Sequence, residues 1–598
     1  MNLHGLVELL AEGYPFAALQ ARLKSERIEI VSPQGAFAPV VATISHLLQQ
    51  NQRANFQTVV LATGREVEEL AGSLKTLDGA VEILELPALE TLPHERLSPS
   101  AETVGRRLKT LHRLGQIAKA GSLTRPTYLL MSVRAALQPL VAGLDQRLPL
   151  QLEKGKDYLL PELSLKLIEM AYQRVDMVTR RGEFAVRGGI LDIFPTTAEH
   201  ALRLEFFGDE LEEIREFSVS DQRSISDKLE AVELFAAREF LITPQVAARA
   251  REMTHEFPNL STMLAKIAEG IPVEGMESLA PALGVKLGPI TDYLGKDAIV
   301  ILQDPQKIEQ RAESLIQTNE EFLHAAWDAA ISGSQAPIDL SGGNFFTVDE
   351  FITKVKKSNV LVSLSALATE AAKDLGYREI PKFTPEQPAT EWLADLMNQN
   401  HKIVVMAHGH GSAERVLEVL TKAELPAVLT SSIGQLATEH ITVSVGQFAH
   451  GFAFLSKKLV LLTEAEFFGV ASSYLAPSER KLARRRGQQV DPLSLKQGDY
   501  VVHEIHGIGR FKELVQRQSG IGARQHFREY LLIEYAPPKR NYPADTLFVP
   551  TDQLDMLTKY VGGEAPVLSK IRAISCPVVP VESMSISSTP LPIAPIGL

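Results

Sequence analysis

The stretch RIEIVSPQGAFA, residues 27–38, decides how the first part of this chain folds. Its first five residues, RIEIV, are apolar and β-branched as in a strand, and a turn follows at Ser32 and Pro33. The helical pattern VVATISHLLQQNQ comes next, and then a second strand-like run, QTVVLAT, at residues 57–63. Strand, helix and strand in this order predict a β-α-β unit, which belongs to a parallel sheet.

The same sheet should continue further along the chain. The runs VEILELP (81–87) and PTYLLMS (126–132) predict two more strands of an α/β layer structure over residues 1–150. The continuous apolar run DAIVILQDP (297–305) is typical of a buried strand, and it should return the chain to this sheet within residues 241–335. We therefore expect a mainly parallel sheet with helices on both faces.

Residues 151–240 have a different pattern of apolar and polar residues. RGEFAVRGGILDIFP (181–195) and ALRLEFFGDELEEIREFSV (201–219) contain short alternating runs that are broken by glycine-rich turns. Alternation of this kind is typical of antiparallel strands with one buried face. The sequence therefore predicts an antiparallel β domain inserted into the parallel sheet domain.

The second half of the chain should hold two further domains. Residues 346–468 predict a second α/β unit around the strand HKIVVMA, and the polar, basic residues 469–495 are typical of a linker. Residues 496–570 predict a small β-barrel, since their strands are short and punctuated by glycine. The proline- and serine-rich residues 571–598 should be disordered. The fold class is therefore multidomain, with α/β and α+β parts.

Composition limits the classes of protein to which the chain can belong. Its 598 residues exceed the usual size of one domain, about 100 to 200 residues, so four or five domains are expected. It has 45% hydrophobic residues but no continuous apolar stretch of the roughly 18 residues that a membrane helix needs, and it shows no secretion signal. The single cysteine, Cys576, excludes an internal disulfide and fits a cytoplasmic protein. The net charge of −12 argues against a protein that binds nucleic acid phosphates over its whole surface.

The turn after the first strand lacks the chemistry of a nucleotide site. A phosphate-binding loop needs G-x-x-x-x-G-K-[ST], because Lys and the hydroxyl reach the terminal phosphate and magnesium. The corresponding residues here are Ser32, Pro33, Gln34, Gly35 and Ala36, without the Lys or the hydroxyl that should follow. The strand IVIL also ends in Gln303-Asp304-Pro305, where a hydrolase would carry an Asp-Glu pair. We predict no ATP hydrolysis, no catalytic residue and no bound cofactor.

Histidines offer two weaker candidates. His503 and His506 could be a zinc pair, but no cysteine or third ligand is near, so a surface or capping role is favoured and no metal is predicted. His408-Gly409-His410-Gly411 follows a strand and could hold an anion at a helix N-terminus. A plain turn is the simpler interpretation there.

Four motifs together indicate a family. ETLPHERLSPSAETVGRRL (90–108), GEFAVRGGILDIFP (182–195), GMESL (275–279) and VVHEIHGIGRF (501–511) stand in the order and spacing of bacterial transcription-repair coupling factors, often called Mfd. The chain resembles this family over about residues 1 to 570. Several motifs in register over hundreds of residues are far more specific than one glycine-rich turn.

The resemblance implies a fold and a function. The N-terminal half of that family is similar to the excision-repair protein UvrB, and it has a degenerate nucleotide fold with an inserted domain that binds UvrA. An α/β domain of unclear role follows, and then a CarD-like, Tudor-like barrel that grips the β subunit of RNA polymerase. The full-length family also has a translocase that uses ATP and magnesium on the double-stranded DNA upstream of the polymerase. From about Ile571 this sequence departs from the pattern, so we expect no motor here and a two-partner adaptor for nucleotide-excision repair.

The resemblance also suggests residues that bind UvrA. Arg174 in YQRVD and Arg187 in FAVRG are the carried-over contacts, and Phe194 is a candidate apolar anchor. Arginine suits such a role because its planar fork binds carboxylates with two hydrogen bonds. The structural alternative is that Arg187 caps a turn and that Phe194 fills the core of the small domain.

Two further groups are candidates for binding polymerase and DNA. The strand from Arg510 to Val515 could pair along a sheet edge with the polymerase β subunit. Its candidate residues are Arg510, Phe511, Leu514 and Val515, with Tyr530 and Tyr535 as alternates, and core packing is the competing role. The cluster Lys481, Arg484, Arg485 and Arg486 could contact DNA phosphates, although a solvated linker is the favoured interpretation.

Two other functions remain to be separated from the adaptor. A UvrB-like ATPase would need a Lys-Thr pair in the loop after Val31, which is absent. A stand-alone CarD-type transcription regulator would act only through residues 496–570 and would not need residues 1–470 for polymerase binding.

Overall fold

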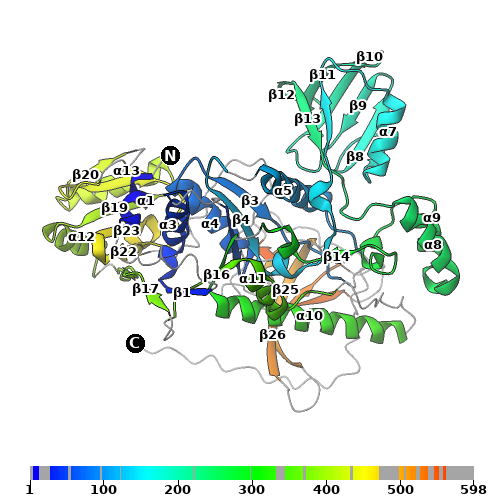
Figure 1. Cartoon of the computed structure of the whole chain (residues 1–598). Helices are drawn as coiled ribbons and strands as arrows, with labels where there is room; N and C mark the ends of the chain where they lie inside the picture. The colour runs from blue at the N-terminus through cyan, green and yellow to red at the C-terminus, as the bar shows by residue number, and fades with distance from the viewer. Residues whose placement is uncertain are drawn as a thin grey trace. The chain divides into compact units, whose positions relative to one another are not determined.

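The computed structural model shows a multidomain α/β and β chain (Figure 1). It describes residues 4–12, 27–50, 56–93, 97–120, 123–219, 222–295, 298–331, 344–367, 372–384, 386–430, 436–469, 497–503, 507–519, 526–536, 544–550 and 557–559. Two compact units are present, and the second contains residues 320–337 and 481–598.

The first sheet has seven parallel strands in the order β17-β1-β16-β15-β2-β4-β3. The strands are β1 (Arg27–Val31), β2 (Phe56–Leu61), β3 (Glu82–Leu86), β4 (Thr127–Ser132), β15 (Ile299–Gln303), β16 (Val360–Ser365) and β17 (Lys373–Asp374). Every residue of β2 and β4 is buried, as is typical of central strands with helices on both faces. The strand expected at 297–305 does return to this sheet, as β15.

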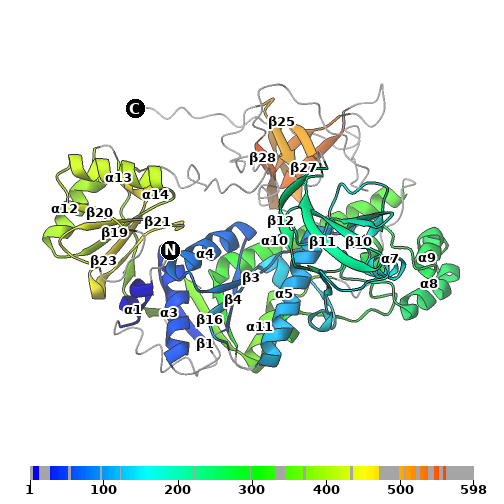
Figure 2. The same cartoon turned by 90° about the horizontal axis from the view of Figure 1, so that it is seen from above.

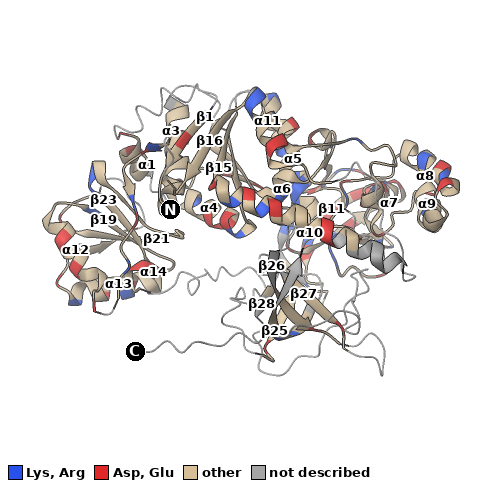
Figure 3. Ribbon diagram, turned by 90° about the horizontal axis from the view of Figure 1, so that it is seen from below, with Lys and Arg blue, Asp and Glu red and all other residues tan. Residues whose placement is uncertain are grey.

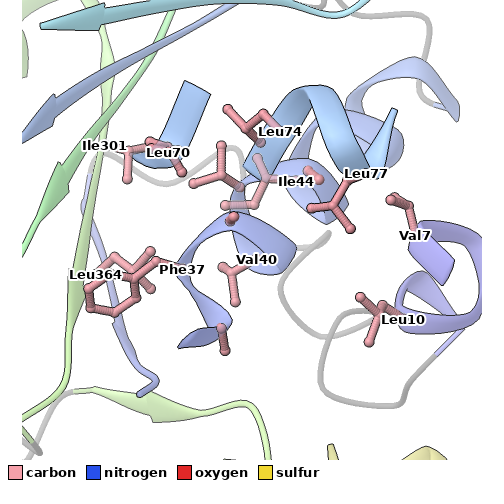
Figure 4. Close-up of a cluster of buried hydrophobic side chains, with 14 of the residues drawn as sticks. Val7, Leu10, Phe37, Val40, Ile44, Leu70, Leu74, Leu77, Ile301 and Leu364 are labelled. Carbon is pink, nitrogen blue, oxygen red and sulfur yellow. The ribbon is translucent and has the colours of Figure 1, made fainter. Parts of the chain in front are cut away.

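Helices cover both faces of this sheet (Figures 1 and 2). On one face lie α1 (His4–Ala11), α3 (Phe37–Gln50) and α4 (Gly64–Leu77), and their apolar side chains form a common cluster (Figure 4). The other face is covered by α5 (Ala101–Ala120), α6 (Val133–Leu137), α11 (Val348–Ser358) and the first part of α10 (Pro305–Ile331). Strand residues alternate between the two cores, with Val59 in the first and Val60 in the second.

One expected boundary differs from the structure. The second α/β unit was predicted to begin at residue 346, but α11 and β16 belong to the first sheet, where β16 lies between β1 and β15. The apolar run of β16 is needed there, because without it the facing edges of β1 and β15 would lack hydrogen-bond partners. The first sheet therefore extends past residue 346, to β17 at Lys373–Asp374.

The inserted β domain has a six-stranded sheet in the order β12-β11-β10-β9-β8-β7, antiparallel except for the β7–β8 pair. Its strands are β7 (Gln173–Arg174), β8 (Glu183–Arg187), β9 (Ile190–Ile193), β10 (Ala201–Phe207), β11 (Glu210–Phe217) and β12 (Ser224–Leu229). Helix α7 (Leu160–Glu169) packs on one face of this sheet through Leu163 and Leu167. The paired strands β6 (Leu150–Glu153) and β13 (Ala231–Leu234) join the domain to the rest of the chain.

A small helical region follows the inserted domain and has its own core. It contains α8 (Pro244–Glu256) and α9 (Ser261–Ala268), whose Met253, Leu264 and Ile267 are buried together with Met276 and Leu279. A short pair, β5 (Leu140–Val141) with β14 (Leu287–Gly288), ties this region to the main domain.

A second α/β sheet has the order β18-β22-β23-β19-β21-β20. Its strands are β18 (Tyr377–Arg378), β19 (Lys402–Ala407), β20 (Ala427–Leu429), β21 (Ile441–Val445), β22 (Phe452–Phe454) and β23 (Leu459–Thr463), and its helices are α12 (Ala389–Asn398), α13 (His410–Lys422) and α14 (Glu464–Phe467). One face packs on α12 and α13, whereas residues of the other face, among them Phe452 and Phe454, join the core of the first sheet. The two sheets therefore share buried surface.

The last described strands form an open sheet and not the predicted closed barrel. The order is β27-β26-β25-β24-β28, and within the residues that the structure describes the terminal strands β27 and β28 do not pair with each other. The strands are β24 (Tyr500–His503), β25 (Gly507–Ser519), β26 (His526–Glu534), β27 (Thr546–Pro550) and β28 (Leu557–Lys559). Phe511, Leu531, Ile533 and Val549 are buried together, so the curled sheet encloses a core although its edges stay apart.

A polar junction holds the base of the inserted domain. Arg238 donates hydrogen bonds to Ser98 Oγ at 2.7 Å and to Glu277 Oε1 at 2.6 Å. Burial raises the pKa of Glu277, although the charge of Arg238 and the Ser98 hydroxyl favour its ionised form. Ser98 belongs to the motif ETLPHERLSPSAETVGRRL and Glu277 to GMESL, so two motifs that are distant in the sequence meet at this junction.

Next to this junction lies a buried ion pair. The Arg107 side chain is completely buried, and its Nε donates to Glu239 Oε1 at 2.5 Å while its Nη1 donates to the Pro87 carbonyl at 2.7 Å. Arg147 Nη1 donates to the carbonyl of Glu239 at 2.8 Å. These contacts connect α5 to the segment that leaves the inserted domain.

Along α4 and α10, basic and acidic residues are interspersed (Figure 3), which fits a moderately acidic net charge. No helix in the described ranges is long and apolar enough to cross a membrane.

We predict that Glu239→Gln destabilises the first unit, because it leaves the buried Arg107 cation without a counter-ion. Breaking a buried pair in this way costs about 3 to 5 kcal/mol. The matched control is Glu85→Gln, which removes the half-buried partner of the exposed Arg106 and should cost less than about 1 kcal/mol. Scanning calorimetry of the whole chain would compare the unfolding midpoints, and equal midpoints for the two variants would contradict the prediction.

Candidate partner-binding surfaces

The turn after β1 is buried against the second α/β sheet. Ser32 donates its backbone N–H to the Ser365 carbonyl at 2.9 Å, and residues Gln34–Ala36 form a single 3-10 turn that leads directly into α3. Gly35 lies so close to the backbone of Gly451 that a methyl group added to it would overlap the Gly451 carbonyl oxygen. The backbone at Gly451 therefore packs directly against this loop at Gly35.

The segment that covers the loop is itself held in place. Gly451 donates its N–H to both oxygens of Glu466, at 2.8 and 3.0 Å. Gln447 donates its N–H to Thr76 Oγ1 of α4 at 2.9 Å. The side chains of Pro33 and Gln34 are half-buried and exposed, and Ala36 is buried. The contact between the loop and Gly451 is therefore part of a bonded interface and not a loose approach.

Strand β7 places Arg174 at the edge of the inserted sheet. Tyr172, two residues earlier, is buried and donates a hydrogen bond from its hydroxyl to the Phe235 carbonyl at 2.9 Å. Burial raises the pKa of Tyr172 to about 12. Arg174 is exposed and is aligned with Phe184, three residues before Arg187 on β8. The two arginines therefore lie about 10 Å apart along the sheet, given a rise of roughly 3.3 Å per residue.

Arg187 is exposed at the end of β8, and it donates a hydrogen bond to the Asp176 carbonyl. It thereby steadies the loop that follows Arg174, as the turn-capping alternative would require. Its guanidinium stays exposed and has further N–H groups for a partner. The structure is compatible with both roles for Arg187.

Phe194, expected as an apolar anchor, is only 7% exposed. It belongs to a small core with Val178, Ala185 and Phe217, and the Arg181 guanidinium lies over its ring at 4.9 Å. The strand alternates, and a Phe at the last inward position before Pro195 is covered by the loop around Val178. An anchoring role for Phe194 is therefore corrected to a packing role.

Sequence reasoning missed a ladder of ion pairs on the sheet face opposite α7. Asp192 accepts two hydrogen bonds from Arg203, at 2.7 and 2.9 Å, and Glu205 accepts one from Arg215. These residues lie on adjacent strands β9, β10 and β11, between residues of the α7-side core. The alternation of charged and apolar residues in ALRLEFF and ELEEIREF would have been the signal for such a solvated face.

In the last sheet, β25 presents a strand edge. Strand β24 pairs with residues 507–510 on one side of β25, and β26 pairs along 510–519 on the other. In the described part of the chain, residues 513–519 have no strand partner on the side away from β26. Leu514 is 40% exposed on this stretch, and Val515 is half-buried.

One of the predicted polymerase contacts is packed into the domain, and another is held in a partly exposed ion pair. Phe511 is 5% exposed and lies in the core with Leu531 and Ile533, so its predicted contact role is corrected to packing. Arg510 is paired with Glu534, which also binds Lys512 at 2.8 Å. Burial opposes ionisation of Glu534, but Lys512 and Arg510 outweigh it and lower its pKa. Of the alternates, Tyr535 is fully buried and Tyr530 is half-buried.

The remaining candidates fall into three groups. His503 is buried and His506 lies outside the described residues, and no group of three metal-binding side chains occurs within the described ranges. His408, two residues before α13, donates its backbone N–H to Glu464 at 3.2 Å. The linker residues Lys481, Arg484, Arg485 and Arg486 lie outside the described residues.

Three family models match parts of the chain. Residues 150–240 match the UvrB interaction domain, residues 396–467 the MFD D3 domain, and residues 495–561 the CarD-like/TRCF RID domain. The first and the last coincide with the inserted sheet and with the sheet that contains β25.

Whole-length relatives agree with these matches. The transcription-repair-coupling factors of Mycobacterium tuberculosis and Mycobacterium bovis are 40% identical over 596 residues, which is 95% of this chain and 47% of theirs. The protein of the same name from Staphylococcus aureus is 26% identical over 89% of this chain and 45% of its own length. The chain spans about half the length of these relatives. Over the half that it shares with them, the chain belongs to the family of transcription-repair-coupling factors.

Proposed function

We propose that this chain is an adaptor for transcription-coupled nucleotide-excision repair in the cytoplasm. It binds the excision-repair protein UvrA through the inserted β domain and the β subunit of RNA polymerase through the edge of β25. The observation that carries the proposal is that each matched interaction domain exposes residues of the expected kind, Arg174 and Arg187 in one and Leu514 in the other.

The exposed arginines of the proposed UvrA surface favour a partner that places a carboxylate opposite them. A guanidinium binds a carboxylate through two parallel N–H groups, and arginine is enriched among the residues that dominate interface energies. The ion-pair ladder beside Arg187 adds polar groups of both signs, since Asp192–Arg203 and Glu205–Arg215 cross three strands. A partner with matching charges gains specificity from this pattern more than affinity.

At the polymerase surface the backbone supplies much of the binding. An added strand beside residues 513–519 would receive main-chain hydrogen bonds, as in other complexes formed by β-strand addition. Leu514 supplies an apolar side chain next to this edge. Contacts between the basic linker and the double-stranded DNA upstream of the polymerase remain a prediction, because those residues lie outside the described ranges.

The same proposal excludes a nucleotide cofactor from the described domains. The loop Ser32–Ala36 has neither the Lys nor the hydroxyl of a phosphate site, and Gly451 occupies the adjacent space. ATP and magnesium therefore have a role only in the motor of full-length relatives. The chain acts through its surfaces.

Arg187→Ala should weaken UvrA binding by about thirtyfold or more, the range of interface hot spots. Binding to the polymerase β subunit should not change, because Arg187 lies in the other matched interaction domain. Biolayer interferometry with purified partners measures both affinities. Arg249→Ala, an exposed arginine on α8, is the control and should leave both unchanged. Wild-type affinity of Arg187→Ala for UvrA would refute the assignment.

Leu514→Arg should reduce binding to the polymerase β subunit by about tenfold or more, because a charge replaces an apolar contact beside the docking edge. UvrA binding should persist. Phe511→Ala provides a contrast: it should destabilise the domain by about 3 to 5 kcal/mol through loss of core packing. Thermal unfolding followed by circular dichroism separates the two effects, and a folded Leu514→Arg variant with normal polymerase binding would count against the proposed edge.

The purified chain should show neither saturable MgATP binding nor turnover. Isothermal titration calorimetry and a phosphate-release assay measure these two properties, with an intact helicase-type ATPase run in parallel as the positive control. Stoichiometric MgATP binding would show that the Gly35–Gly451 contact opens, and it would revive the ATPase alternative.

A further inference from the structure

An open pocket lies at one end of the inserted β sheet, where the β10–β11 hairpin meets the segment before α7. Its volume is about 370 Å³, and Asp157, Tyr158, Leu159, Phe207, Asp209 and Glu210 line it. Tyr158 donates its N–H to the Asp209 carbonyl at 2.7 Å, and Leu211 donates to the Lys156 carbonyl at 3.0 Å. The walls are thus joined by backbone hydrogen bonds and keep their spacing.

Two large apolar side chains are exposed in this pocket. Phe207 is 76% exposed and Leu159 is 47% exposed, whereas the adjacent Phe206 packs against the core under α7. An aromatic ring left in water has a large area to gain from burial by a partner. Gly208, with φ of 63°, makes the tight turn that holds Phe207 at the tip of the hairpin.

The charges around these side chains are all negative. The three acidic side chains of the lining, Asp157, Asp209 and Glu210, are exposed, and none of them has an ion pair within the described residues. The nearest basic residues in sequence are engaged elsewhere, Lys156 with Glu153 at 2.8 Å and Lys154 with Glu230 at 3.4 Å. The pocket therefore offers an aromatic face and free carboxylates together.

This end of the sheet also carries Arg187. Phe206 donates its N–H to the Gly189 carbonyl at 2.8 Å, so the β8–β9 and β10–β11 turns are neighbours. One protein that covers Arg187 can extend across the turns to Phe207. Such a protein would meet a positive charge at one end of its contact surface, at Arg187, and negative charges at the other end, in the pocket.

We propose that this pocket receives an arginine side chain from the partner that docks on Arg187. The guanidinium stacks on the Phe207 ring and pairs with Asp209 or Glu210, while the aliphatic stem packs on Leu159. This proposal rests on the proposed function, because it takes UvrA as the protein that covers Arg187. It adds a second contact region whose charge is opposite to that of the first.

The test is the affinity of the full chain for purified UvrA, measured by biolayer interferometry at low and at moderate salt. Phe207→Ala and the double variant Asp209→Asn/Glu210→Gln should each weaken binding by about tenfold. The double variant should also flatten the salt dependence, because it removes charge attraction. The control is Leu165→Ala, which removes another exposed apolar side chain, on α7 and outside the pocket, and this variant should bind as the wild type does.

The outcomes separate this inference from the proposed function. Normal binding by both pocket variants, together with loss of binding by Arg187→Ala, would overturn the pocket and leave the adaptor intact. Failure of the wild-type chain to bind UvrA would overturn both. Folding does not confuse the result, because all three substituted side chains are exposed, and equal melting temperatures would verify this.

Discussion

The close approach of Gly35 to the Gly451 carbonyl is the constraint on which the architecture of the first unit depends. Any side chain at Gly35 would push the second α/β sheet away from the first. Without such a side chain, Phe452 and Phe454 join the core that α3 and α4 form on the first sheet. This contact lets the two sheets share one core.

The inserted domain depends on a different kind of contact. Its base is held by charged groups, the buried pair of Arg107 with Glu239 and the partly buried pair of Arg238 with Glu277. Apolar contacts have little directional preference, whereas hydrogen bonds between charged side chains hold only in a few relative orientations of those side chains. The polar junction is therefore suited to fix the direction in which the domain presents its strands.

The two proposed docking surfaces differ in physical character. On the inserted domain, exposed arginines, the ion-pair ladder and the acidic pocket around Phe207 present side chains, so recognition there depends on charge pattern. On β25 the exposed element is a backbone edge with Leu514 beside it, so recognition there depends on hydrogen bonds that every sequence can make. The two proposed surfaces therefore require different kinds of match from whatever binds them.

By itself the sequence determined the parallel sheet, the antiparallel insert and the lack of a phosphate-binding motif after β1, because periodicity and missing Lys or hydroxyl groups are local properties. It also determined the family, through motifs such as GMESL. Only the tertiary structure decided that β16 completes the first sheet, that Phe194 and Phe511 are buried, and that the last described strands stay open. It also brought Ser98 to Glu277, and Phe207 to Asp157 and Leu159. The physical reason is that burial and proximity depend on which distant segments pack together. Alternation of apolar and polar residues along a strand indicates that the strand has two different faces, but it does not indicate which neighbouring segment covers each face.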